Sequence, residues 1–431
     1  MYAACDRSGY RRQAAVEQLD ITDPMAVPVL ALRAADWVYE VREPARQALT
    51  RAIVANAGAL LFAAPVGFAL ASKLHGGWLA LLLREELAAC DEAVVRRALE
   101  SADRPFRREV VRVMISRGVL TSADAVRMAE RDRDEVVRSL CAQAAFDLRG
   151  SAHDVRGFLS SRSSPLRAHA VADFARNGDV EPARIALSDR TRTVRAIAQA
   201  SVTSAGEDPA AFYRRELRAV RVVTPALVAG LRETGTAADA ELVRIFLGHE
   251  RPRVRLEAVR SLTALGGADP DDLLPVLSDP SPAVVSWAAR ALLAHARRLD
   301  GTSLRALLES SEPNHVRRAA LRLLGARDAL TRIAVDLEYA NDVALGEYAR
   351  VDLQRFIERD LPNAYLVSDA DPERVADIAA RLTRDGRRLP TRTEAALRFA
   401  LGLAPRPPQP SPTTNHFIRL VRLAAGRPLD S

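Results

Sequence analysis

The sequence predicts an all-α fold, a right-handed α-solenoid of about 12–13 stacked helix pairs. Three observations lead to this prediction. One pattern of apolar residues and arginine returns about every thirty residues over most of the chain. Each period has room for two amphipathic helices, which bury their apolar faces only by stacking on the next pair. Alanine, leucine, valine and arginine dominate the composition, and all but valine favour helix over strand.

The clearest copy of the pattern lies at 188–206, SDRTRTVRAIAQASVTSAG. Asp189 precedes the predicted helix, Val194 is its apolar anchor, and Arg195 follows the anchor directly. Ala198 and Val202 come one and two helical turns later, so the three apolar side chains share one face of the helix. The small alanine at the middle position lets a neighbouring helix approach closely.

Further copies of this anchored helix follow one another along the chain, about thirty residues apart. The predicted anchors are Tyr10, Val41, Phe106, Val137, Leu166, Val194, Val223, Val254, Val284, Val316, Leu345 and Val375. A shorter amphipathic helix precedes the anchored helix, as at 180–187 and 302–308, and Asp, Ser and Pro mark the turns. In chain order, we call the members of a pair the first helix and the second helix. The solenoid is expected to span 1–403.

The spacing doubles between Val41 and Phe106, which predicts a degenerate or inserted unit at about 52–105. This interval contains Ala52–Ser72, an uncharged run about as long as the 20 residues that a membrane span needs. The run is rich in alanine and contains Asn56 and Pro65, so its transfer into lipid is weakly favoured. We therefore expect a buried helix pair of the stack here. Ala52–Ser72 remains the only candidate for contact with a membrane.

The chain changes character after 403. Residues 404–415, APRPPQPSPTTN, predict an extended Pro-rich linker outside the stack. Residues 416–431 begin with HFIRLVRLAA, which predicts a short basic amphipathic helix followed by a tail. This helix either caps the open end of the solenoid or docks onto a partner.

The repeated pattern, Asp followed by Val-Arg, Ala and Leu, resembles the HEAT repeat, particularly its short form of about thirty residues in phycobilisome-lyase-like proteins. The resemblance implies a ladder in which Asp and Arg side chains of successive repeats join neighbouring helix pairs. The ladder residues that match are Asp36 with Arg42, Asp132 with Arg138, and Asp189 with Arg195. Ser or His replaces the Asp in other repeats, so a partial ladder is expected. The resemblance implies a scaffold or adaptor and no particular activity.

Composition sets further bounds. The chain has 62 Lys and Arg against 55 Asp and Glu, a net charge of +7 with both signs interspersed. This mild excess does not by itself indicate binding to nucleic acid. Cys5, Cys90 and Cys141 are far apart and odd in number, which predicts neither a disulfide framework nor a metal knuckle. Asp6 and Arg7 stand where a signal peptide would have its apolar core, so we expect a cytoplasmic protein.

No catalytic constellation stands out in the sequence. The motifs of zinc proteases, P-loop proteins, serine hydrolases and dinucleotide-binding folds do not occur. The seven histidines are scattered singly, without the spacing of metal ligands. We therefore predict no catalytic residues, no metal and no cofactor.

A candidate binding surface lies on the second helices, six residues after the anchor and nearly opposite the apolar stripe. Arg260, Arg290 and Arg322 hold this position in consecutive repeats, and Arg112 holds it in an earlier one. Arg318, with Arg12 and Arg108, would broaden this arginine row from two residues after the anchor. If second helices line a concave face, the arginine row points into a groove for carboxylates or phosphates. The simpler interpretation is a solvated face with partners on the same helix, such as Glu257.

The predicted function is a non-catalytic protein–protein interaction scaffold or adaptor that binds an acidic or extended partner segment. The alternative is a nucleic-acid-binding protein similar to the HEAT-like alkylpurine DNA glycosylases, which use Trp, Asp and Arg around the lesion. The tryptophans here are Trp37, Trp78 and Trp287. A third hypothesis, a lyase-type chaperone that attaches a bilin to cysteine, rests on the repeat type alone.

Overall fold

The computed structural model describes residues 2–148, 152–219, 222–309, 311–359, 372–385, 389 and 391–403. The predicted linker at 404–415 and the predicted helix and tail at 416–431 lie outside the described residues. The described residues form α-helices and short 3-10 helices, and no strand occurs among them. The prediction of an all-α, helical-repeat fold is confirmed.

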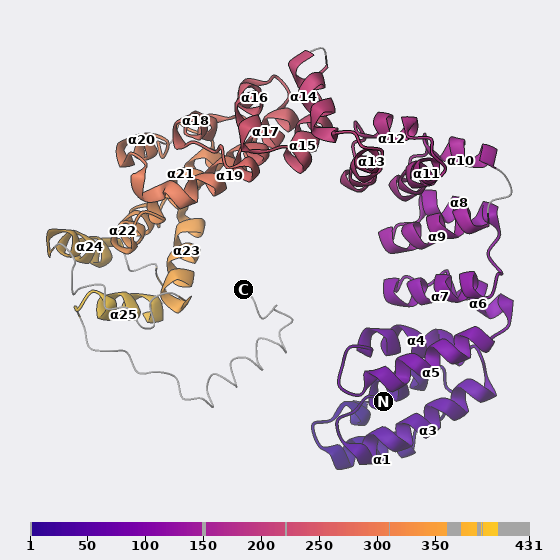
Figure 1. Cartoon of the computed structure of the whole chain (residues 1–431). Coiled ribbons are helices and arrows are strands. Elements are labelled where there is room, and N and C mark those ends of the chain that lie inside the picture. Colours follow the sequence, from indigo (N-terminus) through magenta and orange to yellow (C-terminus); the bar gives the residue numbers. More distant parts are fainter. Residues whose placement is uncertain are drawn as a thin grey trace. The chain divides into compact units, whose positions relative to one another are not determined.

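The chain divides into two compact units, Met1–Pro209 and Ala210–Ser431, each described here by itself. Figure 1 labels most of the α-helices of both. The helices of the first unit are η1 (Tyr2–Cys5), α1 (Gly9–Glu17), α2 (Ala26–Arg33), α3 (Tyr39–Ala55), α4 (Ala59–Leu70), α5 (Gly76–Ala89), α6 (Glu92–Ala98), α7 (Arg104–Ser116), α8 (Ser122–Arg131), α9 (Glu135–Asp147), α10 (Ala152–Phe158), α11 (Ser164–Arg176), α12 (Glu181–Ala186) and α13 (Arg192–Ser204).

The second unit contains the same alternation of a short helix and a longer one. Its helices are α14 (Pro209–Ala219, whose first residue closes the first unit), α15 (Pro225–Thr234), η2 (Ala237–Asp239), α16 (Ala240–Arg244), η3 (Ile245–Gly248), α17 (Pro252–Leu265), α18 (Pro270–Leu273), η4 (Pro275–Ser278), α19 (Pro282–Leu292), η5 (Leu293–Arg298), α20 (Gly301–Ala306), α21 (Asn314–Gly325), α22 (Ala329–Tyr339), α23 (Gly346–Arg359), α24 (Pro372–Asp385) and α25 (Thr391–Ala400).

Second helices pack on second helices within each unit. In the first unit α7 packs on α9, α9 on α11, and α11 on α13, and Figure 1 shows α7 and α9 side by side. In the second unit α15, α17, α19 and α21 pack in the same succession. The predicted stripe of α13 explains this packing, because Val194, Ala198 and Val202 are all buried. The buried core therefore follows the row of second helices.

Two predicted anchors are wrong. Tyr10 is 88% exposed, while Arg12 is buried and makes the contacts that the arginine after an anchor makes elsewhere, so the register of α1 is shifted by one residue. Tyr10 therefore lies on the exposed face of α1, away from α3. Val375 lies on α24, which packs against the first helix α22 and not in the row of second helices.

The uncharged run Ala52–Ser72 forms the last turn of α3, a turn and α4, so the prediction of a complete helix pair is wrong in detail. Helix α4 packs against α2 and α5, with Leu60, Ala63 and Ala64 fully buried. The unit expected at 52–105 contains α4, α5 and α6. Among the helices that the structure describes, none combines the length and hydropathy needed to span a bilayer.

Candidate interaction surface

The recurring contact of the ladder is an ion pair between the arginine of one repeat and the aspartate of the next, bidentate in its full form, which we call a rung. Between α11 and α13, Nε and Nη2 of Arg167 donate to the two carboxylate oxygens of Asp189 at 2.7 and 2.9 Å. Nη1 of the same arginine donates to the main-chain carbonyl of Ser161, six residues before it. One guanidinium thus joins the loop of its own repeat to the loop of the following repeat.

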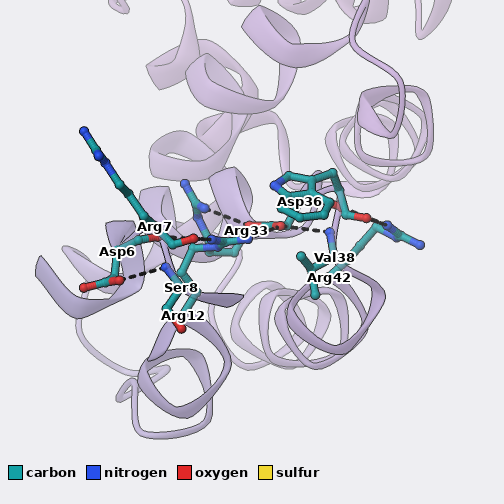
Figure 2. A network of polar contacts seen from close by, with 9 residues as sticks. Asp6, Arg7, Ser8, Arg12, Arg33, Asp36, Val38 and Arg42 are labelled. Carbon is teal, nitrogen blue, oxygen red and sulfur yellow. Dashed lines mark hydrogen bonds and ion pairs between the residues drawn. The ribbon is translucent and has the colours of Figure 1, made fainter. Parts of the chain in front are cut away.

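The same arrangement recurs in both units. The rungs are Arg12–Asp36, Arg107–Asp132 and Arg167–Asp189 in the first unit, and Arg214–Asp239, Arg255–Asp279 and Arg317–Asp342 in the second; Arg107 reaches its aspartate through Nη2, the others are bidentate, and Arg317 turns its Nε to the carbonyl of Leu308. Figure 2 shows the first of them, where Asp36 accepts from Arg12 and Arg33 and also from the backbone N–H of Val38. In this rung the side chain of Arg12 is 4% exposed and that of Asp36 is 1% exposed.

The predicted ladder arginines Arg42, Arg138 and Arg195 bind differently from the pairing that spacing alone suggests. Each donates to the main-chain carbonyl of the aspartate six residues before it, at 2.8 to 2.9 Å. The carboxylates of Asp36, Asp132 and Asp189 accept instead from arginines of the preceding repeat. Aspartate and arginine of one repeat are therefore joined through the main chain, and successive repeats through side chains.

Hydrogen bonds in the rungs favour the ionised form of Asp36, Asp189 and Asp279. Burial alone would raise the pKa of Asp189, but the hydrogen bonds from Arg167 and from the backbone N–H of Thr191 outweigh it and lower the pKa. The same balance lowers the pKa of Asp36 and of Asp279. These ionised carboxylates are already satisfied by protein donors, so the rungs stabilise the stack and offer little to a ligand.

The arginine row lies on other faces of the same helices and is uneven. Arg260 donates to Glu257 at 2.6 Å and lies over the Trp287 ring at 4.7 Å from its centroid, with its side chain 30% exposed. Arg290 is exposed and also lies over the Trp287 ring, with its guanidinium carbon 5.5 Å from the ring centroid. In the first unit Arg112 donates to Glu109 at 2.6 Å. Arg260 and Arg112 thus have partners on their own helices.

Arg290, Arg318 and Arg322 are exposed and form no ion pair with any residue that the structure describes. Arg318 lines a cavity of about 610 Å³ between α21 and α23, which Tyr348, Asp352 and Arg355 also line. Three of the five predicted row residues therefore keep an available guanidinium, and all three belong to the second unit.

A larger cavity, which the sequence did not predict, lies in the first unit, on α7, α9, α11 and α13. We call it the α7–α13 groove. Its volume is about 730 Å³. The lining consists of Arg104, Arg108, Arg133, Asp134, Glu135, Val136, Arg138, Ser139, Ser164, Pro165, Ala168, His169, Ala172, Thr193 and Ile197. The sequence signal for it is weak: arginines stand just before the anchors Phe106 and Val137 of neighbouring repeats.

Asp134 lines the groove and fixes its neighbours by hydrogen bonds. It begins α9 by accepting from the backbone N–H of Val136 at 2.8 Å, and it accepts from Nε of Arg108 at 3.1 Å. Burial opposes ionisation, but these hydrogen bonds together lower the pKa of Asp134. His169 lies half-buried against the Phe146 ring, at 5.5 Å between centroids, and burial lowers its pKa. The positive charge of the groove near neutral pH therefore comes from arginine alone.

The features that the nucleic-acid alternative requires do not meet at either cavity. Trp37 is 75% exposed and lies near Arg12, Trp78 packs under Arg46, and Trp287 lies between Arg260 and Arg290. None of these tryptophans lines the α7–α13 groove or the cavity of α21 and α23. Within the described residues, no group of three or more His, Cys, Asp or Glu side chains is placed to hold a metal ion.

The fold and the rungs define a helical-repeat protein built from short helix pairs. Residues 240–325, which span α16 to α21, match the sequence profile of HEAT repeats, so the chain carries HEAT repeats, as predicted. No protein with a curated description matches the sequence.

Three solved structures illustrate what the chain is similar to. The karyopherin Kap121p bound to Nup53p has 12% identity over 94% of this chain and 52% of its own, with a TM-score of 0.35. Importin beta has 13% identity over 100% of this chain and 62% of its own, with a TM-score of 0.30. A tubulin-recruiting array of TOG domains has 11% identity, covering 89% and 99%, with a TM-score of 0.26. The chain spans about half the length of the Kap121p chain.

Proposed function

We propose that this protein is a non-catalytic scaffold that binds an acidic or extended segment of a partner protein on the exposed face of its second helices. The single observation that supports the proposal most is the contrast between its two sets of arginines. Ladder arginines such as Arg167 are buried and saturated by carboxylate and carbonyl acceptors. Arg290, Arg318 and Arg322 are exposed and have no acidic partner among the residues that the structure describes, and an arginine fork in that state suits a carboxylate of another chain.

Competing hypotheses predict different ligands for the same arginines. A phosphate backbone would also bind them, and its affinity would fall steeply with salt because bound counterions are released. Stacking of bases would need aromatic side chains beside the arginines. Trp287 lies beside Arg290, but both Arg260 and Arg290 already lie against its ring. The protein-segment hypothesis therefore fits the available contacts better.

The test measures fluorescence anisotropy with the full chain and two probes, a labelled oligoglutamate peptide and a labelled DNA duplex of matched charge. The variant R290E/R318E/R322E reverses the three unpaired charges. We expect it to weaken peptide binding by about tenfold or more, since each reversal replaces attraction with repulsion. A matched control, R297E/R298E/R359E, reverses three exposed arginines outside the arginine row and should bind as the original protein does.

Two results would contradict the proposal. Equal peptide affinity of the row variant and the control would show that the arginine row does not bind the partner. Tighter binding of the duplex than of the peptide, falling by about three orders of magnitude between 50 and 200 mM salt, would favour the nucleic-acid alternative. Circular dichroism of each variant checks that the helices are intact.

A further inference from the structure

The α7–α13 groove has the size and the mixed lining of a binding site. Its volume of about 730 Å³ lies within the range of about 300–1,000 Å³ that is usual for ligand sites in proteins. All of its lining residues belong to the second helices of four successive repeats or to the loops directly before them. The stacked repeats hold these helices in place, so the walls of the groove are preformed.

The arginines of the groove fall into two classes. Arg108 is held by Asp134, and Arg138 donates to the main-chain carbonyl of Asp132 at 2.9 Å. Arg104 and Arg133 are exposed and form no ion pair or hydrogen bond with any described residue. The held arginines shape the wall, and the two unpaired guanidiniums are available to an incoming carboxylate.

Beside the arginines, the lining combines polar residues, Glu135, Ser139, Ser164, His169 and Thr193 among them, with an apolar part. Val136, in the first turn of α9, is 36% exposed although it is a large aliphatic residue. Pro165, Ala168 and Ala172 of α11 and the half-buried Ile197 of α13 continue the apolar lining. An apolar side chain of a ligand that packs here would remove the apolar surface of these residues from water, which favours binding. A ligand that matches this groove therefore has an apolar side chain as well as charged groups.

The length of the groove sets the length of its ligand. Four helices packed about 8–10 Å apart give three intervals, a span of about 25–30 Å. An extended chain rises about 3.3 Å per residue, so about eight residues cross the groove. This is a short linear segment and not a folded domain.

We propose that the α7–α13 groove binds an extended acidic peptide of about eight residues that places an apolar side chain among its carboxylates. Charge complementarity with Arg104 and Arg133 selects the carboxylates, and the lining from Val136 to Ile197 receives the apolar side chain. The inference rests on the proposed function as a scaffold, and it names a second site for such a segment on helices other than those that carry Arg290, Arg318 and Arg322.

The experiment titrates the full chain into a fluorescein-labelled octapeptide with one central leucine flanked by glutamates. Comparison peptides carry alanine in place of leucine, glutamine in place of glutamate, or phosphoserine in place of glutamate. We expect R104E/R133E to weaken binding of the leucine peptide about tenfold or more. The matched control R97E/R131E reverses two exposed arginines on the first helices α6 and α8 and should leave binding unchanged. Val136→Ser should weaken binding of the leucine peptide more than that of the alanine peptide.

Each other outcome overturns the inference. If R104E/R133E binds the leucine peptide with wild-type affinity, the groove is not the binding site. If R290E/R318E/R322E nevertheless loses binding of the oligoglutamate probe, the proposed function stands and only the inference about the groove fails. Equal binding of the leucine and alanine peptides removes the apolar pocket. Much tighter binding of the phosphoserine peptide assigns the site to phosphate. Sedimentation that shows a dimer which the peptide dissociates would assign the groove to a second copy of the chain.

Discussion

The α11–α13 segment and the α4–α5 segment of the first unit hold their helices together by different means. Between α11 and α13, Arg167 and Asp189 form a rung whose side chains are 9% and 14% exposed. Helix α4 carries no charged residue, and its Gly67 packs so closely on α5 that an added Cβ would clash with the side chain of Leu83. The Phe68 ring stacks on Phe106 at 6.0 Å. Directional hydrogen bonds fix the first contact and close apolar fit fixes the second, so different substitutions should disrupt them.

The largest effect is expected from removal of a rung. Asp189→Ala leaves the nearly buried guanidinium of Arg167 without its carboxylate and removes the acceptor for the backbone N–H of Thr191. Loss of one partner of a buried ion pair costs about 3–5 kcal/mol. Urea unfolding followed by circular dichroism, with hydrogen exchange of α11 and α13, measures the loss. Asp179→Ala removes a half-exposed carboxylate nearby that accepts from the backbone N–H of Glu181 and lies 3.8 Å from Arg156, and it should cost only about 1 kcal/mol. Equal losses in the two variants would show that the rung contributes nothing special.

The apolar contact between α4 and α5 should be destabilised by a substitution that adds volume to it. Gly67→Ala places a methyl group against Leu83 and Leu79, and such overpacking costs about 1–3 kcal/mol. Gly77→Ala is the matched control in the neighbouring helix, since an added Cβ there meets nothing within 4 Å. We expect the control to be neutral or to stabilise the protein by about 0.4–1 kcal/mol. Thermal unfolding measures the Tm of both variants. If Gly67→Ala has the same Tm as Gly77→Ala, α4 and α5 are not closely packed at Gly67.

A carboxyl group without a rung should respond to pH in the opposite sense from the ladder. Asp336 of α22 is 2% exposed, and burial together with the neighbouring Asp352 raises its pKa to about 8, which Arg332 offsets only in part. In the unfolded chain the pKa is near 3.9. Between these values the folded state holds a proton that the unfolded state lacks, so Asp336 makes stability fall as pH rises from about 4 to 8. A rung carboxylate such as Asp189, whose pKa is lowered, makes stability fall as pH drops below its unfolded pKa.

Asp336→Asn tests this contribution. The amide stays neutral at every pH, so the variant should match the original protein near pH 4 and exceed it by a few degrees in Tm near pH 9. The difference between the two proteins, followed across this range, isolates Asp336 from the other carboxyl groups. A difference that does not change with pH would show that Asp336 is ionised in the folded protein throughout.

The fold could be predicted because burial of one helical face repeats locally. Val194, Ala198 and Val202 lie one turn apart in the sequence and in the structure, and no distant residue is needed to place them. The register of α1 could not be predicted, since Tyr10 fits the pattern of an anchor in the sequence but is exposed, while Arg12 is buried against Asp36.

The candidate sites could be predicted only in part, because their partners come from other repeats. Glu257 could be assigned to Arg260 from spacing on one helix, whereas Trp287 reaches the same guanidinium from the next second helix. Arg104 and Arg133 share the α7–α13 groove through the stacking of α7 on α9. Periodicity shows that repeats stack, but it does not show which side chains meet across the stack.

The smallest effect is expected where the two segments end their helices. Helix α13 ends before Gly206, whose φ of +82° lies in the left-handed region, and the next N–H, of Glu207, donates to the carbonyl of Val202 at 3.2 Å. Helix α5 ends at Ala89, and Cys90, the residue after it, is extended, with no glycine in the left-handed region there. Gly206→Ala meets no atom within 4 Å, so its cost is backbone strain alone, about 1 kcal/mol. Thermal unfolding should show a decrease for Gly206→Ala, and hydrogen exchange should place it at the end of α13. An unchanged or higher Tm would mean that the turn relaxes out of the left-handed region without cost to the stack.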